Sequence, residues 1–334
     1  MKAFVQVGER FQVLLYLCAI VGGAGLGLAV PTAAPTLGGA ISPLLAALLY
    51  VTFLSIPLVR LGAALRDLRF LGSVLVVNFV VAPAVVFVVS RPLIDDRALL
   101  LGVLLVLLTP CVDYVIVFTG LAGGDRERLL AATPLLMVVQ IVLLPGYLFL
   151  FAGPTTIALI DVAPFVMAFV TLIVLPLVVA AVTQVLARKL PFAAGVHRHS
   201  GDVMVPLMMV TLAVVVGSQI HAVAAQLPQL LAAVPIFVVF LCVMLAVGVV
   251  AGRLARMDVP AARAVAFSGV TRNSLVVLPL ALALPVEFAL APLAVVTQTL
   301  IELVGMVVLV RLVPRVVPDR PIVRDTMPPP IVYR

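Results

Sequence analysis

Long apolar runs, separated by short charged or Pro/Gly-containing breaks, constrain the fold of this chain more than any other feature. A helix needs about 20 mostly apolar residues to cross a bilayer. The runs between breaks form ten such segments, at 11–30, 38–59, 70–90, 98–122, 129–152, 162–187, 202–224, 228–252, 262–285 and 288–312. The sequence therefore predicts an all-α polytopic membrane protein with ten transmembrane helices.

Charge is too scarce to cover a water-soluble protein of this size. Of the 334 residues, 64% are hydrophobic and 10% are charged, whereas a soluble domain has about 25% charged residues. This difference excludes a soluble enzyme and a disordered chain. The 3 cysteines form neither a disulfide framework nor a CxxC pair. We expect no cofactor and no metal site.

The basic residues alternate between successive loops. Of the 21 Lys and Arg residues, all but three lie before the first span, in or beside every second loop, or at and after the end of the last span. Arg91 and Arg97 lie on the opposite side, and Arg272 lies within a span. The positive-inside rule then places both termini in the cytoplasm of a cell-membrane protein. Because topology explains the net charge of +7, nucleic acid is not needed as a partner.

The fourth and ninth expected spans each have a short polar centre between two apolar arms. Pro110 lacks an N–H and interrupts the helical hydrogen-bond ladder of the fourth span. In the ninth span, Gly269 offers backbone freedom, and Thr271 begins a run of side chains that compete for backbone hydrogen bonds. Both spans are therefore expected to be broken.

The two broken spans occupy corresponding places in two halves of five spans each. An odd number of spans gives the halves opposite orientations, as in many transporters. We expect two inverted five-helix repeats in which the broken helices 4 and 9 cross. The predicted divisions are a first repeat at 1–152, a second at 153–313 and a disordered cytoplasmic tail at 314–334.

Three formal charges fall in the interior of the expected spans, away from their ends, where an unpaired charge costs several kcal/mol. Asp113 and Arg272 lie beside the two breaks, and they form either a structural ion pair or a gating or proton-coupling pair. Glu302 follows Gln298 by one helical turn. It is either a proton carrier or a cap for polar groups of a neighbouring helix.

The other polar residues of the spans are candidates for solute contact or for helix packing. Asn78 and Gln140 are lone amides, suited to interhelical hydrogen bonds or to ligand binding. Cys111 follows the helix-breaking proline, and a soft thiolate there suits a thiophilic solute. The remaining candidate solute contacts are Thr109, Asn273 and Ser274.

These residues resemble those of the arsenite-efflux permeases, within the bile acid/arsenite/riboflavin transporter superfamily. The run LLTPCVDYVIVFTGLAGGD at 107–125 is similar to the fourth-span motif of those permeases. Weaker similarities are Asn78 with Pro83 in the third span, GVTRNS at 269–274 and Glu302 in the last span. The resemblance implies a ten-helix fold with a panel domain and a core domain, unwound crossing spans 4 and 9, and a required thiol at Cys111.

Two departures from the family pattern affect the expected coupling. Arsenite permeases carry Asn-Asn-aromatic-Glu in the ninth span, whereas this chain has Arg-Asn-Ser-Leu at 272–275 and lacks that glutamate. Sodium symporters of the family place an acidic residue and a glutamine at this crossing. Arg272 would repel sodium there and could attract an anionic solute.

Two transport functions follow from these expectations. The first is a secondary transporter that exports arsenite or a related metalloid by proton antiport. The alternative is a sodium- or proton-coupled symporter of a small organic anion. An enzyme is not expected, because the buried histidine of rhomboid proteases and the acidic clusters of prenyl transferases are missing from the spans. A channel or membrane scaffold is left open, as is a homodimer in the lipid bilayer.

Overall fold

The computed structural model describes residues 2–55, 67–112, 114–153, 156 and 162–319. Within these ranges the regular structure is helical, apart from one isolated backbone bridge. In chain order the first helices are α1 (Lys2–Ala29), α2 (Ala34–Ser55), α4 (Leu68–Val76), α5 (Ala82–Val89), α6 (Arg97–Leu107), α7 (Tyr114–Leu121) and α8 (Arg126–Ala152). They are followed by α10 (Val162–Phe169), α11 (Leu175–Leu186), α12 (Pro191–Ala225), α13 (Leu227–Leu230), α14 (Val234–Leu254), α15 (Val259–Val270), α16 (Ser274–Leu282) and α17 (Leu290–Val316).

Within the described residues, short pieces of other helix types lie between these helices. Two π-helical turns, η3 (Val77–Val81) and η5 (Val170–Val174), join α4 to α5 and α10 to α11. Three 3-10 turns lie in connections between helices, at η1 (Pro31–Ala33), η4 (Arg91–Leu93) and η6 (Val286–Phe288).

The described part of the chain contains 7 helical stretches that are long and apolar enough to cross a membrane. This finding agrees with a multi-pass membrane protein. The expected span 98–122 is divided between α6 and α7, and the expected span 262–285 is divided between α15 and α16. The last helix runs further than expected, because α17 continues through Pro314 to Val316. Residues 320–334 of the expected tail lie outside the described residues.

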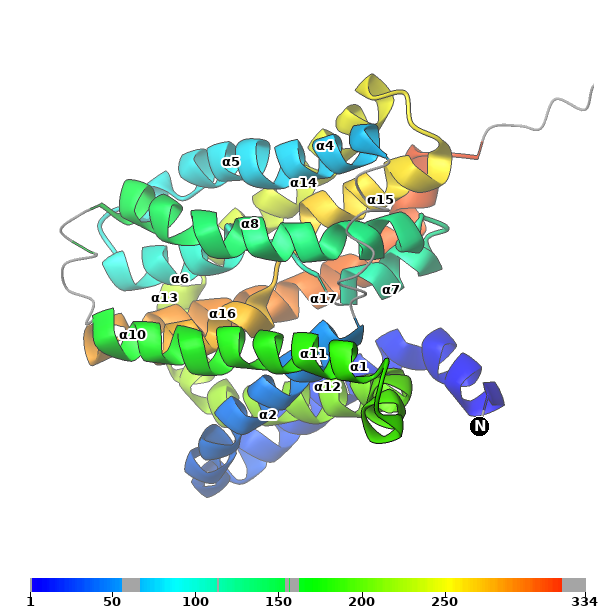
Figure 1. The fold of residues 1–334 in the computed structure, drawn as a ribbon. Helices are drawn as coiled ribbons and strands as arrows, with labels where there is room; N and C mark the ends of the chain where they lie inside the picture. The colour runs from blue at the N-terminus through cyan, green and yellow to red at the C-terminus, as the bar shows by residue number, and fades with distance from the viewer. Residues whose placement is uncertain (1, 56–66, 113, 154–155, 157–161, 320–334) are drawn as a thin grey trace, which may run out of the picture.

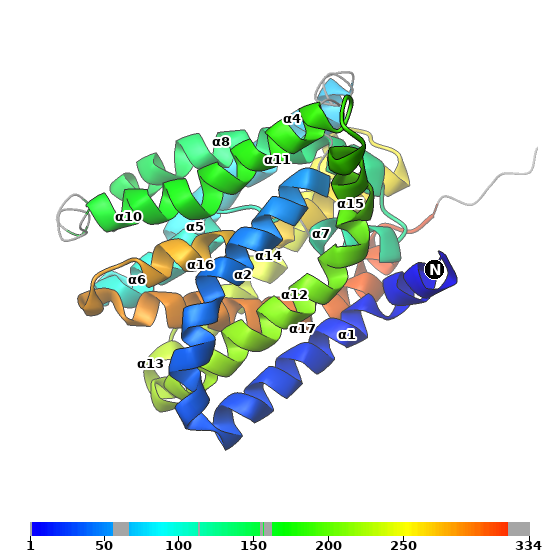
Figure 2. The same cartoon turned by 60° about the horizontal axis from the view of Figure 1, so that its bottom comes forward.

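The helices pack as two groups (Figure 1). In one group α1 and α2 pack on α12, and α11 packs mainly on α2, as the turned view of Figure 2 shows. The other group contains α4, α5, α6, α7, α8, α14, α15 and α17. Helix α16 packs on α17 and also contacts α2 and α10, so it lies between the groups. Each expected half of the chain contributes helices to both groups.

Small residues let helices of the second group approach closely. A Cβ atom added to Gly248 of α14 would lie 2.5 Å from the Cα atom of Ala266 in α15. A Cβ atom added to Gly102 of α6 would lie 2.6 Å from the backbone oxygen of Ala291 in α17. Without a hydrophobic driving force between helices in lipid, such close packing is a main source of helix association. These contacts fix α6 and α15 against their neighbours.

The π-helical turn η3 places one amide at the centre of the second group. Pro83 lacks the N–H that would bond to the carbonyl oxygen of Phe79, and the Tyr147 hydroxyl of α8 donates to that oxygen instead, at 2.5 Å. Within this turn, Asn78 is buried and donates to the Ser268 hydroxyl of α15 at 2.9 Å. Helix α4 and the following turn are thereby tied to α15.

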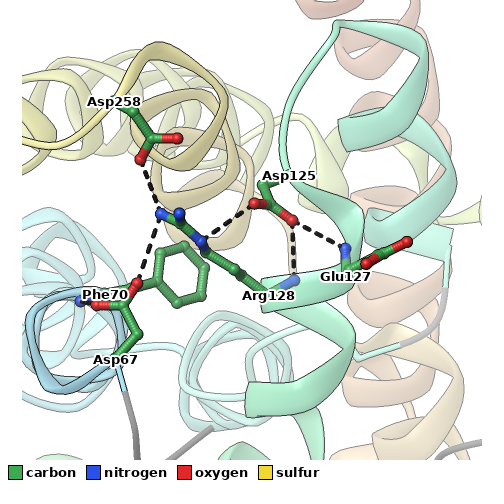
Figure 3. A network of polar contacts seen from close by, with 6 residues as sticks. All are labelled: Asp67, Phe70, Asp125, Glu127, Arg128 and Asp258. Atoms are coloured by element: carbon green, nitrogen blue, oxygen red, sulfur yellow. Dashed lines mark hydrogen bonds and ion pairs between the residues drawn. The ribbon is translucent and has the colours of Figure 1, made fainter. Parts of the chain in front are cut away.

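One arginine joins three helix N-termini at one end of the second group (Figure 3). The guanidinium of Arg128 lies 3.4 Å from the Asp67 carboxylate, 3.1 Å from that of Asp125 and 2.7 Å from that of Asp258. These aspartates occupy the N-cap positions of α4, α8 and α15. Three loops that the charge pattern assigns to one side of the membrane therefore meet at one ion-pair cluster.

Candidate functional site

Two helix interruptions pass each other within the second helix group. The first separates α6 from α7, the second separates α15 from α16, and an antiparallel bridge joins Pro110 to Arg272. The Cys111 N–H donates to the Thr271 oxygen at 3.2 Å, and the Asn273 N–H donates to the Thr109 oxygen at 2.8 Å. Backbone groups that have left the helical ladder thus satisfy one another, as a buried interruption requires. We call these two segments, Leu108–Val112 and Thr271–Asn273, the crossing.

The polar residues of the crossing hold the adjoining helix ends. The Thr109 hydroxyl donates to the Leu105 oxygen at 2.6 Å, and the Thr271 hydroxyl donates to the Phe267 oxygen at 2.8 Å. These threonines occupy matching places at the ends of α6 and α15. Asn273 is the N-cap of α16, and its side-chain oxygen accepts from the next turn of that helix. The hydroxyls of Thr109 and Thr271 and the amide of Asn273 therefore stabilise the helix ends on either side of the interruptions.

Arg272 brings a cation into the crossing and is 0% exposed. One of its terminal nitrogens, Nη2, donates to the Asn78 side-chain oxygen at 3.1 Å and to the carbonyl oxygen of Gly269. The guanidinium carbon lies 4.9 Å from the centre of the Phe240 ring, a cation–π contact. The other guanidinium nitrogens, Nε and Nη1, have no hydrogen-bond partner among the described residues.

Glu302 of α17 lies against the interruption between α15 and α16. Its two carboxylate oxygens lie 3.1 and 3.0 Å from the backbone nitrogen of Arg272. The Tyr114 hydroxyl lies 2.7 Å from Oε1, and the Gln298 side-chain nitrogen donates to Oε2. The carboxylate thus contacts the backbone that joins α15 to α16.

A thiol and several unsatisfied donors gather at the crossing. Cys111 is fully buried and interacts electrostatically with Arg272. The Asn273 side-chain nitrogen and the Ser274 hydroxyl are buried without hydrogen-bond partners among the described residues, as are Nε and Nη1 of Arg272. Burying such a group unpaired costs about 1–3 kcal/mol. Together these groups could hold a small solute that offers a soft atom to the thiol and oxygens to the donors.

A small cavity borders the crossing on the side of α14 and α17. It is lined by Leu107, Phe237, Phe240, Leu241, Val270, Gln298, Ile301 and Glu302. The Gln298 side-chain oxygen is buried without a partner among the described residues. The cavity therefore offers polar contacts at Gln298 and Glu302 in otherwise apolar walls.

Three expected site residues are placed differently or not at all. Gly269, expected in the ninth-span break, lies within α15, and the break begins at Thr271. A Cβ atom at Gly269 would lie 2.9 Å from Val77, so the glycine serves close packing against η3. Asp113 lies outside the described residues. Gln140 is buried in α8, and no contact between it and the crossing is seen.

Two residues of the site were not singled out from the sequence. Tyr114 contacts both Glu302 and the backbone of Arg272, and Phe240 stacks below the Arg272 guanidinium. Tyr114 could have been selected from the sequence, because its hydroxyl-bearing ring lies beside the polar centre of an apolar span. The sequence offered no comparable signal for Phe240, because α14 consists almost entirely of apolar residues and nothing distinguishes Phe240 among them.

Comparison with known families places this chain among the transporters. The model of the Sodium Bile acid symporter family (SBF) matches residues 42–226, which is more than half of the chain. The chain belongs to this family. The match includes the first interruption and ends before the second. No curated protein matches the chain.

Membership in the SBF family fixes the general class of activity. The family is one of transporters, so the chain is a membrane transporter of a small solute that uses a coupling ion, and it is not an enzyme. This class agrees with the apolar helices of the structure. The arrangement at the crossing bears on which solute and which ion are used.

Proposed function

We propose that this SBF-family protein exports arsenite or a related metalloid by proton antiport, with alternating access around the crossing. The observation that carries the proposal is the position of Cys111. Its side chain is 0% exposed and lies in the interruption whose backbone pairs with that of the other interruption. Thiolates are preferred ligands of soft, thiophilic species. The other two cysteines, Cys18 and Cys242, are exposed and lie in α1 and α14.

The electrostatic surroundings support a thiophilic solute. Arg272 interacts electrostatically with Cys111, so a cation lies beside the thiol that would contact the solute. The unpaired nitrogens of Arg272 and Asn273 can donate to the oxygens of the solute. A fixed cation at this place also disfavours sodium, so we assign the coupling to protons.

The proposal includes the membrane arrangement inferred from the sequence. Ten spans form two inverted repeats, 1–152 and 153–313, with both termini in the cytoplasm of the cell membrane. The meeting of three basic loops at Arg128 supports a common side for those loops. The interruptions between α6 and α7 and between α15 and α16 correspond to broken helices 4 and 9.

A second function, symport of a small organic anion, is favoured by one observation. The donors that have no partner among the described residues of the crossing include Nε and Nη1 of Arg272, and each of these nitrogens can donate a hydrogen bond to a carboxylate oxygen. In this case Arg272 would be the main solute contact. Cys111 would then be a small buried side chain of little consequence for transport.

Metalloid tolerance tests the first function. Wild type, C111S and C242S are expressed in cells that lack their own arsenite efflux pump, and growth is measured over a series of arsenite and antimonite concentrations. We expect tolerance from wild type and C242S, and none from C111S at equal membrane abundance. The matched control carries the same substitution at an exposed cysteine of α14.

Two results would reject the metalloid function. One is a wild type that confers no tolerance. The other is a C111S variant as protective as wild type, which would favour the organic-anion function, since Cys111 has no necessary part in it.

A further inference from the structure

The Tyr114 hydroxyl faces two acceptors with one proton. Its oxygen lies 2.8 Å from the carbonyl oxygen of Arg272 and 2.7 Å from Oε1 of Glu302. Both distances are those of hydrogen bonds. A hydroxyl donates one hydrogen bond and can accept others. When Glu302 is ionised, both neighbours are acceptors, and Tyr114 can satisfy only one of them.

Adding a proton to Glu302 completes the hydrogen bonding. The protonated Oε1 donates to the Tyr114 oxygen, and the Tyr114 hydroxyl donates to the carbonyl oxygen of Arg272. The other oxygen, Oε2, accepts from the Arg272 backbone nitrogen at 3.0 Å and from the Gln298 side chain. Each of these four hydrogen bonds then has one proton and one acceptor.

Ionising Glu302 leaves a backbone group of the crossing unsatisfied. The Tyr114 proton turns toward Oε1, since a hydrogen bond to a charged group is stronger than one to a neutral carbonyl. Among the described residues, Tyr114 is the donor found for the Arg272 carbonyl, which belongs to a buried interruption. Loss of a proton at Glu302 therefore removes a hydrogen bond from the backbone where α15 and α16 are joined.

We propose that the Tyr114 hydroxyl couples protonation of Glu302 to the conformation of the backbone at Arg272. Tyr114 is a positioning residue in this relay, and Glu302 is the site that carries the coupling proton. On release, the proton on Oε1 leaves toward the cavity that Glu302 lines. The Tyr114 hydroxyl keeps its proton and turns, so that its hydrogen bond passes from the Arg272 carbonyl to Oε1. On uptake both movements reverse. The inference rests on the proton coupling assigned under the proposed function.

The groups that face Glu302 allow this exchange. The Arg272 guanidinium interacts with it electrostatically, and Cys111 interacts in turn with that guanidinium. Gln298 faces Glu302 from its own helix, whereas α6 and α14 present apolar side chains to the cavity, from Leu107 to Phe240. Asp113, the neighbour of Tyr114 in the chain, lies outside the described residues. Tyr114 is the hydroxyl found to bridge Glu302 and the crossing backbone in the described structure.

Infrared spectroscopy of the purified protein in lipid vesicles tests the relay without any solute. The carbonyl stretch of a protonated carboxyl group is followed as pH is raised. Wild type should show a band that disappears on titration, and E302Q should lack it. Y114F should shift the band and displace its titration midpoint by about one pH unit, because one hydrogen bond to the charged form is lost.

A matched control uses another tyrosine whose hydroxyl makes a hydrogen bond in the other helix group. In Y50F the lost bond is to the Thr183 hydroxyl, between α2 and α11, so the band and its midpoint should equal those of wild type. The relay is overturned if wild type has no band that E302Q removes, or if Y114F titrates as wild type does. Because no solute is added, neither result bears on the metalloid function. In the same way, a failed tolerance assay would not contradict the relay, which the infrared measurement tests separately.

Discussion

At the scale of single residues, the site is decided by which buried polar groups have partners. Nη2 of Arg272 has two acceptors, whereas Nε and Nη1 have none among the described residues. A buried charge is costly unless hydrogen-bonded, so Asn78 and Gly269 stabilise the guanidinium in its place. The nitrogens Nε and Nη1 are therefore the guanidinium atoms available to a solute.

The importance of Asn78 can be measured by removing its amide. N78L deletes the acceptor for Arg272 and the donor to Ser268, and we expect a loss of about 2–3 kcal/mol in the free energy of unfolding. Q140L is the matched control, because Gln140 is a buried amide whose oxygen has no partner in the described structure. Its loss should stay below about 1 kcal/mol. Denaturant unfolding in detergent supplies both values, and equal losses would contradict this role.

Residue chemistry also shows how far the sequence could predict the site. Cys111, Arg272 and Glu302 could be selected because charge and a proline-adjacent thiol are rare in apolar spans. Tyr114 could not be assigned its role, because its two partners lie 158 and 188 residues away in the chain. Which donors lack partners depends on side-chain placement that no local pattern contains.

At the scale of elements, the crossing depends on helices held close on either side of each interruption. The sequence indicated the break near Pro110, since a missing N–H acts locally. It indicated the other break from Gly269 together with Thr271, but Gly269 lies within α15, because glycine is also selected for close approach between helices. The structure separates the two causes: Gly269 packs against Val77, and Thr271 leaves the helix.

Close packing of α6 on α17 gives a test at this scale. G102V places a side chain where a Cβ atom would lie 2.6 Å from the Ala291 oxygen, so the helices must separate. We expect a loss of about 1–3 kcal/mol in stability, typical of overpacking, and a lower transport rate. G146A is the control, because nothing lies within 4 Å of a Cβ atom there. Thermal unfolding and transport of both variants supply the comparison, and a fully active G102V would contradict the expected coupling of packing to the site.

At the scale of the whole molecule, the scarce charges gather at a few places. Arg128 joins three aspartates at the N-termini of α4, α8 and α15. The chain pattern predicted that these loops share one side of the membrane, but it could not predict that one arginine would contact all three. The cluster brings the N-terminal ends of the three helices together at one place.

Loss of the cluster should have a modest effect that depends on salt. R128Q leaves three carboxylates without their shared cation, and we expect a loss of about 1 kcal/mol at low ionic strength, since exposed ion pairs contribute little. The difference from wild type should shrink in high salt because screening weakens both attraction and repulsion. R126Q is the control, as Arg126 is exposed and makes no ion pair in the described structure. An equal shift in both variants, unaffected by salt, would contradict this account.

The most direct test of the central claim is arsenite flux into proteoliposomes under an imposed proton gradient, measured for wild type and C111S. The account predicts saturable, gradient-dependent flux for wild type, unchanged when sodium is replaced by choline. It predicts loss of that flux in C111S, with C242S equal to wild type. Flux that requires sodium would contradict proton coupling, and flux that persists in C111S would contradict a metalloid site at the crossing of the two interrupted helices.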